Sequence, residues 1–117
     1  MANFVEHYLS ARHRDEPGRG CPMASLSGDI ARLPVAARKR FTIGATRLTN
    51  SIGELLGKLG HADGEALATS LVAEMVGALA LSRAVIDPVQ SDRILEASRD
   101  AIKARIGPAQ PRKRAKR

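Results

Sequence analysis

The chain has 117 residues, of which 44% are hydrophobic and 26% charged, a composition typical of one small globular domain and not of a disordered chain. Aromatic residues make up only 3%, so the core must be built from Ala, Leu, Ile and Val, side chains that suit close packing of helices. A domain of this length buries a limited fraction of its surface, so association with a second chain would stabilise it.

The net charge is +7, and five of the positive charges lie in the last six residues, 112–117. The rest of the chain is nearly neutral, whereas a fold that grips nucleic acid with its own surface normally carries the basic excess on the fold. The single cysteine, Cys21, cannot form an internal disulfide. No segment has the roughly 18 unbroken apolar residues of a membrane span, and the N-terminus lacks a secretory pattern. We therefore expect a soluble cytoplasmic protein that makes no membrane contact.

The spacing of apolar residues predicts about five helices and no strand. The first helix is expected over 2–14, followed by a loop with two prolines and two glycines between residues 14 and 22. A short helix over 22–32 comes next, opened by Pro22. The third is expected over 34–59. Its inward residues are Phe41, Leu48, Ile52, Leu55 and Leu59; Gly44 and Gly53 weaken it and allow a kink, and Gly57 and Gly60 end it.

The fourth predicted helix, 64–86, has Asp63 as its expected N-cap and is apolar around most of its circumference. A helix of this kind must be covered on nearly all sides. The chain's own helices can cover one side, so the other side is expected to contact a second chain. The fifth helix, 91–106, capped by Ser91 or Gln90, has one apolar stripe (Ile94, Leu95, Ser98, Ile102 and Ile106). Residues 1–107 thus form the domain, and 108–117 are predicted to be a disordered basic tail.

Three stretches resemble a branch of the TetR family of transcriptional regulators. They are YLSARHRDEPG at 8–18 with GCPMASL at 20–26, EMVGAL at 74–79 with LSRAV at 81–85, and SDRIL at 91–95. The resemblance covers about residues 1–106 and implies an effector-binding and dimerisation domain. Nothing in the chain matches the helix-turn-helix domain with which this family begins, so specific DNA binding by this chain alone is not expected.

The resemblance implies a homodimer in which the last two helices pair with their copies as a four-helix bundle. The interface residues are then expected to be Leu67, Leu71, Met75, Ala78, Leu79, Ser82, Ile94, Leu95, Ser98 and Ile102. It also implies that the first three helices surround a pocket for a small apolar effector, with Phe4, Tyr8, Met23, Leu26, Phe41 and Ala45 as candidate lining residues. The alternative for these six residues is a plain packing role in the core.

The tail residues Arg112, Lys113, Arg114, Lys116 and Arg117 are candidates for nonspecific nucleic-acid contact, or else for a solvated end. Cys21 before a helix start is a candidate reactive thiol, or a small packing residue. No phosphate loop, catalytic constellation or metal-ligand spacing occurs, so we expect no enzyme, no cofactor and no metal. The alternative function is a small helical interaction protein that forms mixed dimers with a full-length regulator.

Overall fold

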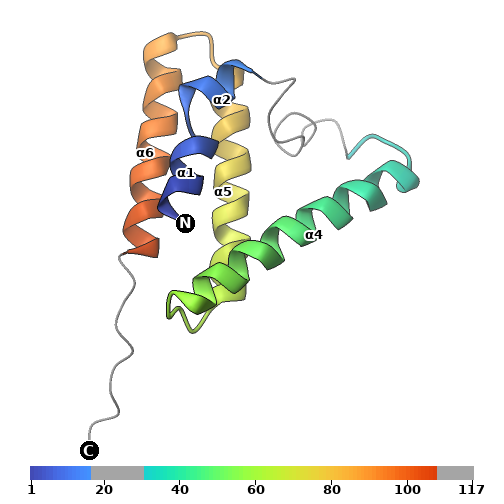
Figure 1. Ribbon diagram of the computed structural model, residues 1–117. Helices are drawn as coiled ribbons and strands as arrows, with labels where there is room; N and C mark the ends of the chain where they lie inside the picture. The colour runs from blue at the N-terminus through green and yellow to red at the C-terminus, as the bar shows by residue number, and fades with distance from the viewer. Residues whose placement is uncertain (17–30, 108–117) are drawn as a thin grey trace, which may run out of the picture.

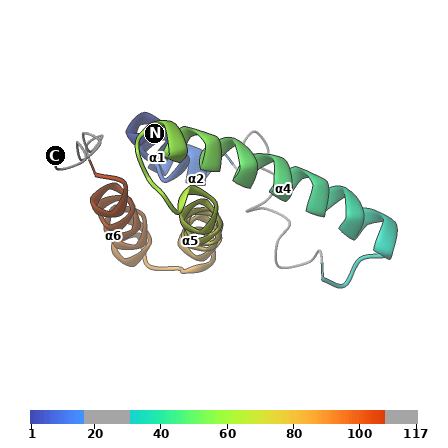
Figure 2. The same ribbon diagram turned by 90° about the horizontal axis from the view of Figure 1, so that it is seen from below.

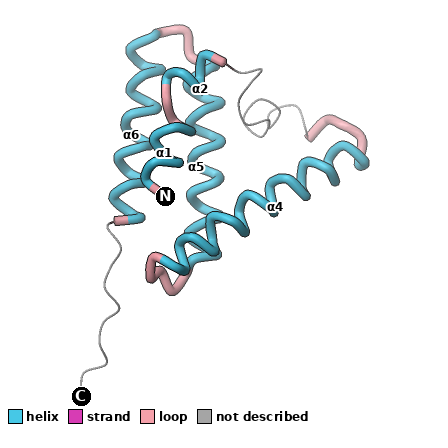
Figure 3. The backbone as a smooth tube through the Cα atoms, viewed as in Figure 1, coloured by secondary structure: helices cyan, strands magenta, loops and turns pink. Residues whose placement is uncertain are grey.

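The computed structural model describes residues 1–16 and 31–107, and these residues form helices joined by short loops, with no strand among them (Figure 1, Figure 3). The helices are α1 (Ala2–Tyr8), α2 (Ala11–Asp15), α4 (Val35–Lys58), α5 (Gly64–Ala84) and α6 (Pro88–Ile106). The all-helical class is therefore confirmed. The predicted helix 22–32 falls outside the described residues except for its last two, which lie in a turn, and the predicted tail 108–117 falls outside them altogether.

The expectation of one helix over 2–14 was wrong, because Ser10 divides the segment into α1 and α2. The backbone of Ser10 is extended, and its hydroxyl accepts a hydrogen bond from the amide of His13 at 3.1 Å, capping α2. The same hydroxyl donates to the carbonyl of His7 at 2.7 Å. A serine that binds backbone groups on both sides stabilises a helix end more than a helix interior.

Glycines shape the junction between α4 and α5. Gly60 has a positive φ of 96°, and the amide of His61 donates back to the carbonyl of Leu56 at 3.0 Å, a common way to end a helix with glycine. Gly53 and Gly64 let the two helices approach closely, since a Cβ on Gly64 would lie 2.9 Å from the carbonyl oxygen of Gly53. α4 remains helical from Val35 to Lys58, through both interior glycines.

The last helix begins three residues before its predicted start. Asp87 is the N-cap, its carboxylate accepts from the amide of Val89 at 3.1 Å, and Pro88 follows as the first helical residue. α5 ends at Ala84, so Ile86, predicted to be its last residue, lies in the connecting turn and is 98% exposed. The predicted cap Ser91 is instead buried inside α6.

The helices form two layers. α5 and α6 lie side by side as one layer, and α1, α2 and α4 all lie on the same side of that pair (Figure 2). The core between the layers contains Val5, Tyr8 and Leu9 from the first helix and its end, Ile52 and Leu56 from α4, and a larger set from α5 and α6 (Ala68, Leu71, Val72, Met75, Ala78, Leu79, Leu95, Ile102 and Ile106). In α4, Leu56 is inside and Leu55 is 46% exposed, the reverse of the predicted order.

α5 is the most apolar helix of the described residues. Its most apolar window has a mean hydropathy of 1.4, and 39% of that window is buried within the chain. By length and composition alone α5 is long enough to cross a membrane, a test that the core helix of a globular protein also passes. A large part of this apolar helix therefore remains uncovered by the described residues.

Candidate functional site

The side of the α5–α6 layer that faces away from α1, α2 and α4 is uncovered by other described helices (Figure 2). We call it the free face and define it by residues that recur every three or four positions along each helix: Ala66, Ser70, Ala73, Gly77 and Leu81 of α5, and Ile94, Ala97 and Ala101 of α6. All but the half-buried Ile94 are exposed, and Leu81 is 52% exposed. The free face is thus accessible along both helices.

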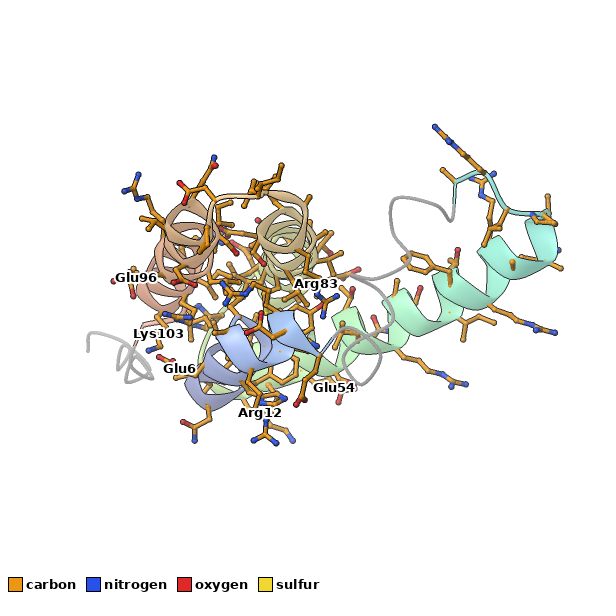
Figure 4. The ribbon with its side chains drawn as sticks, turned by 90° about the horizontal axis from the view of Figure 1, so that it is seen from above. Glu6, Arg12, Glu54, Arg83, Glu96 and Lys103 are labelled. Carbon is orange, nitrogen blue, oxygen red and sulfur yellow. The ribbon has the colours of Figure 1, made fainter. Side chains whose placement is uncertain are left out.

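None of the residues that define the free face is charged, but Arg105 of α6 lies against it and donates to the hydroxyl of Ser70 at 3.2 Å. Between Ala66 and Leu81, the only charged residue of α5 is Glu74, which is half-buried beside the face and pairs with Arg105 of α6. The charged residues of α6 gather mainly elsewhere: Arg99 and Lys103 lie on the opposite flank, where both pair with Glu6 of α1 (Figure 4). An exposed face of a helix in a monomeric protein is normally charged or strongly polar. The free face is therefore less polar than the exposed face of a helix normally is.

The free face is also built from small side chains. Alanine, serine and glycine allow two helix backbones to approach closely, and a Cβ on Gly77 would meet no atom of this chain within 4 Å. Glycine in a helix interior costs roughly 1 kcal/mol against alanine. Among the residues that the structure describes, no contact requires a glycine at this position, and its outer side is open.

Most of the predicted interface residues do not lie on the free face. Leu71, Met75, Ala78, Leu79, Ser82, Leu95 and Ile102 are buried inside the single chain. The folded single chain therefore does not present these side chains to a partner, which the predicted interface requires. The physical reason is that α1 and α4 pack on the bulky side of α5 and α6. Leu67, Ile94 and Ser98 are half-buried, and their interface role stays a prediction.

The described candidates for the effector pocket are not brought together. Tyr8 is buried in the core, and Phe4, one turn away with its ring 5.9 Å from that of Tyr8, is 37% exposed. Phe41 and Ala45 lie in the first half of α4, which extends away from α1 (Figure 1). Met23 and Leu26 lie outside the described residues, as does Cys21. The cavities described for residues 1–16 and 31–107 are lined by other side chains.

A polar junction joins α2 to the corner where α5 meets α6. Arg14 donates to the hydroxyl of Ser91 at 3.0 Å and to the carboxylate of Asp92. Its hydrogen bond to Asp15 lowers the pKa of that carboxyl below its usual value. Arg83 donates to the carbonyls of His13 at 2.8 Å and Arg14 at 3.1 Å (Figure 4). The junction therefore fixes α2 against the end of the helical pair.

The junction borders an open cavity of about 460 Å³, lined by Arg14, Asp15, Ser82, Arg83, Val85, Ile86, Pro88 and Ser91. Two carboxylates neutralise Arg14, so the site lacks the excess positive charge that would attract an anion. Sequence reasoning did not find this junction, because Arg14 and Ser91 are 77 residues apart and no local pattern connects them. Within the described ranges, no three His, Cys, Asp or Glu side chains are grouped to hold a metal ion.

Comparison with known proteins adds no relative. No family model matches the chain, no curated protein matches it, and no solved structure matches it.

Proposed function

We propose that this chain is a self-associating helical domain of a transcriptional regulator similar to the TetR family, and that two copies meet through their free faces. The observation that carries the proposal is the exposed, small-residue free face on α5 and α6, whose neighbouring charges Glu74 and Arg105 pair with each other. The resemblance of residues 8–26, 74–85 and 91–95 to that family supports the regulatory part. The free face replaces the buried residues first assigned to the contact.

A second copy of the same chain suits this face for a physical reason. In a twofold dimer the same patch lies on both sides of the contact, so a charge near the twofold axis approaches its own copy. The charges beside the free face, Glu74 and Arg105, neutralise each other within one chain. Two helices from each chain would then form a four-helix bundle, in which small residues allow a short distance between helices. The added burial also compensates for the limited core of a short chain.

The test uses Gly77→Arg with Gly57→Arg as its matched control. Both glycines lie in helices, are exposed, and have open space where a Cβ would be added. Neither substitution should disturb the folded monomer. Gly77→Arg places a long cation in the centre of the free face, so a dimer would bring two of these cations close together. We expect their repulsion to weaken association roughly 100-fold. Gly57→Arg, on α4, should leave association unchanged.

Light scattering across a dilution series gives the measurement. The wild-type chain and Gly57→Arg should have a mass twice the 12.5 kDa of one chain, and Gly77→Arg should have the mass of one chain at the same concentrations. A wild-type mass of one chain at every concentration would contradict the dimer. A Gly77→Arg variant that dimerises as well as wild type would place the contact on another surface.

We also propose that the domain binds a small apolar effector. The resemblance to the TetR family is the support for this part of the proposal. Binding to the folded state raises the free energy of unfolding by about 2.7 kcal/mol when the ligand is present at 100 times its Kd. We therefore expect at least one compound in a panel of uncharged aromatic and aliphatic molecules to raise the thermal midpoint of the chain. A panel that never moves the midpoint counts against the effector.

A further inference from the structure

The first half of α4 and the turn before it form a basic arm, defined here as residues 31–47. It holds five cationic side chains (Arg32, Arg38, Lys39, Arg40 and Arg47) and no acidic one. The other described residues, 1–16 and 48–107, hold eleven acidic and eight basic side chains. The nearly neutral average over the body of the chain therefore conceals a separation of charge between the arm and the helices that carry it.

The arm extends away from the body of the domain (Figure 1). The second half of α4 packs on α5 through the buried Ile52 and Leu56. No residue from 31 to 51 is buried, and Val35 and Ile43 are 64% and 53% exposed. All five arm cations are exposed, and side chains ending in nitrogen stand out from α4 there (Figure 4). The arm is accessible to a large partner.

Cations elsewhere in the domain are largely matched by neighbouring acids. Lys103 pairs with Glu6, Arg105 with Glu74, and Arg14 with Asp92. Among the ion pairs of the part of the chain that the structure describes, none involves a cation of the arm. The arm therefore presents its positive charge to solvent without local compensation, and a polyanion gains the most from contacting it.

A second copy of the arm is a poor partner, because pairing two arms would bring five cations against five cations. The placement of the cations around the helix then distinguishes between DNA and an anionic membrane as the partner. Arg38, Lys39 and Arg40 are consecutive and point about 100° apart around the helix axis. A helix that lies on an anionic membrane keeps its cations on one side and its apolar residues on the other. Phe41, Ala45 and Leu48 form one apolar side of this part of α4. The exposed Val35 and Ile43, however, lie among the cations on the other side, so that division is incomplete.

We propose that the basic arm binds the phosphate backbone of double-stranded DNA without sequence preference. The major groove of a DNA duplex admits one α-helix, and cations on several sides of such a helix reach phosphates on both flanking strands. Each phosphate neutralised releases condensed counterions, which makes the affinity dependent on salt. This contact is independent of the predicted contact through the tail and of the dimer at the free face.

The experiment measures binding of the full chain to a fluorescent 20-base-pair duplex by anisotropy, at several salt concentrations. The test variant is Arg38→Gln/Lys39→Gln/Arg40→Gln. The matched control is Arg12→Gln/Lys58→Gln/Arg93→Gln, which removes the same charge from exposed sites outside the arm. Arg47→Gln is a second, single-site variant of the arm. Every variant keeps the tail, so the tail contributes equally throughout.

We expect the arm variant to bind about tenfold more weakly at low salt. The slope of log affinity against log salt should become shallower by roughly one for each phosphate that the variant no longer neutralises. Arg47→Gln should show a smaller decrease in affinity in the same direction, and the charge-matched control should be weakened less than the arm variant. Unchanged circular dichroism and thermal midpoint establish that the variants are folded.

Two results would overturn the assignment. Equal decreases in affinity for the arm variant and the control would mean that only total charge matters, and no decrease in either would mean that another segment holds the duplex. Vesicles of phosphatidylglycerol serve as the competing polyanion. If the arm variant failed to bind vesicles while still binding the duplex as wild type does, the arm would be a membrane-surface element and the DNA proposal would be wrong.

Discussion

Leu71→Ala is expected to destabilise the domain by about 2–5 kcal/mol, the range for a fully buried leucine that leaves a cavity. Leu71 has no exposed surface and lies in the core between the two layers. For a domain whose total stability is on the order of 5–15 kcal/mol, this corresponds to a thermal midpoint lower by roughly 10–20 °C. Chemical unfolding and a thermal scan both measure it.

The control for Leu71→Ala is Leu81→Ala, on the same helix but 52% exposed. We expect it to change the stability of the monomer by much less. The protein concentration distinguishes the two roles: destabilisation of the core of one chain is the same at every concentration, whereas the effect of an interface substitution shrinks on dilution, as the wild-type dimer itself dissociates. If the effect of Leu71→Ala depended strongly on concentration, Leu71 would belong to an interface after all.

Gly64→Ala is expected to destabilise the domain by about 1–3 kcal/mol, because the added methyl group would lie 2.9 Å from the carbonyl oxygen of Gly53. A backbone carbonyl cannot rotate away as a flexible side chain does, so α4 must move off α5. The thermal midpoint should fall, and amide exchange should quicken in the second half of α4, where packing against α5 is weakened.

Gly53→Ala is the matched substitution on the facing helix, and its expected effect has the opposite sign. Its added methyl group would lie 3.6 Å from the carbonyl oxygen of Gly64, an ordinary contact distance. Alanine is favoured over glycine in a helix interior by roughly 1 kcal/mol. The variant should therefore be as stable as wild type or more stable. If both variants were destabilised equally, the close approach would not be specific to Gly64.

The free face illustrates where sequence reasoning succeeded and where it stopped. The wide apolar surface of helix 64–86 predicted that the chain's own helices cover only part of it, and the described residues do leave one side of α5 uncovered. It did not indicate which side remains open, because apolar residues around most of a helix define no single inward direction. The family resemblance placed the leucines and the methionine of this helix at the contact with the partner. In the structure those residues face α1 and α4, and alanine and glycine face outward.

The break at Ser10 and the start of α6 at Pro88 were both within reach of the sequence. Serine followed by a helix, and aspartate followed by proline, are ordinary N-terminal signals. At Ser10, apolar spacing across 2–14 outweighed the cap. At Asp87 the proline was interpreted only as the end of the preceding helix, although the same pair caps the next one.

The sequence by itself determined the helical class and, within a few residues, the extent of α4, α5 and α6. Those features depend on apolar spacing, caps and glycines that act over one or two helical turns. The tertiary structure alone decided that α1 and α4 pack on one side of α5 and α6, and that half of α4 projects as a basic arm. It also joined Arg14 to Ser91 and Asp92. These features depend on contacts between distant segments, and no local pattern specifies which faces meet.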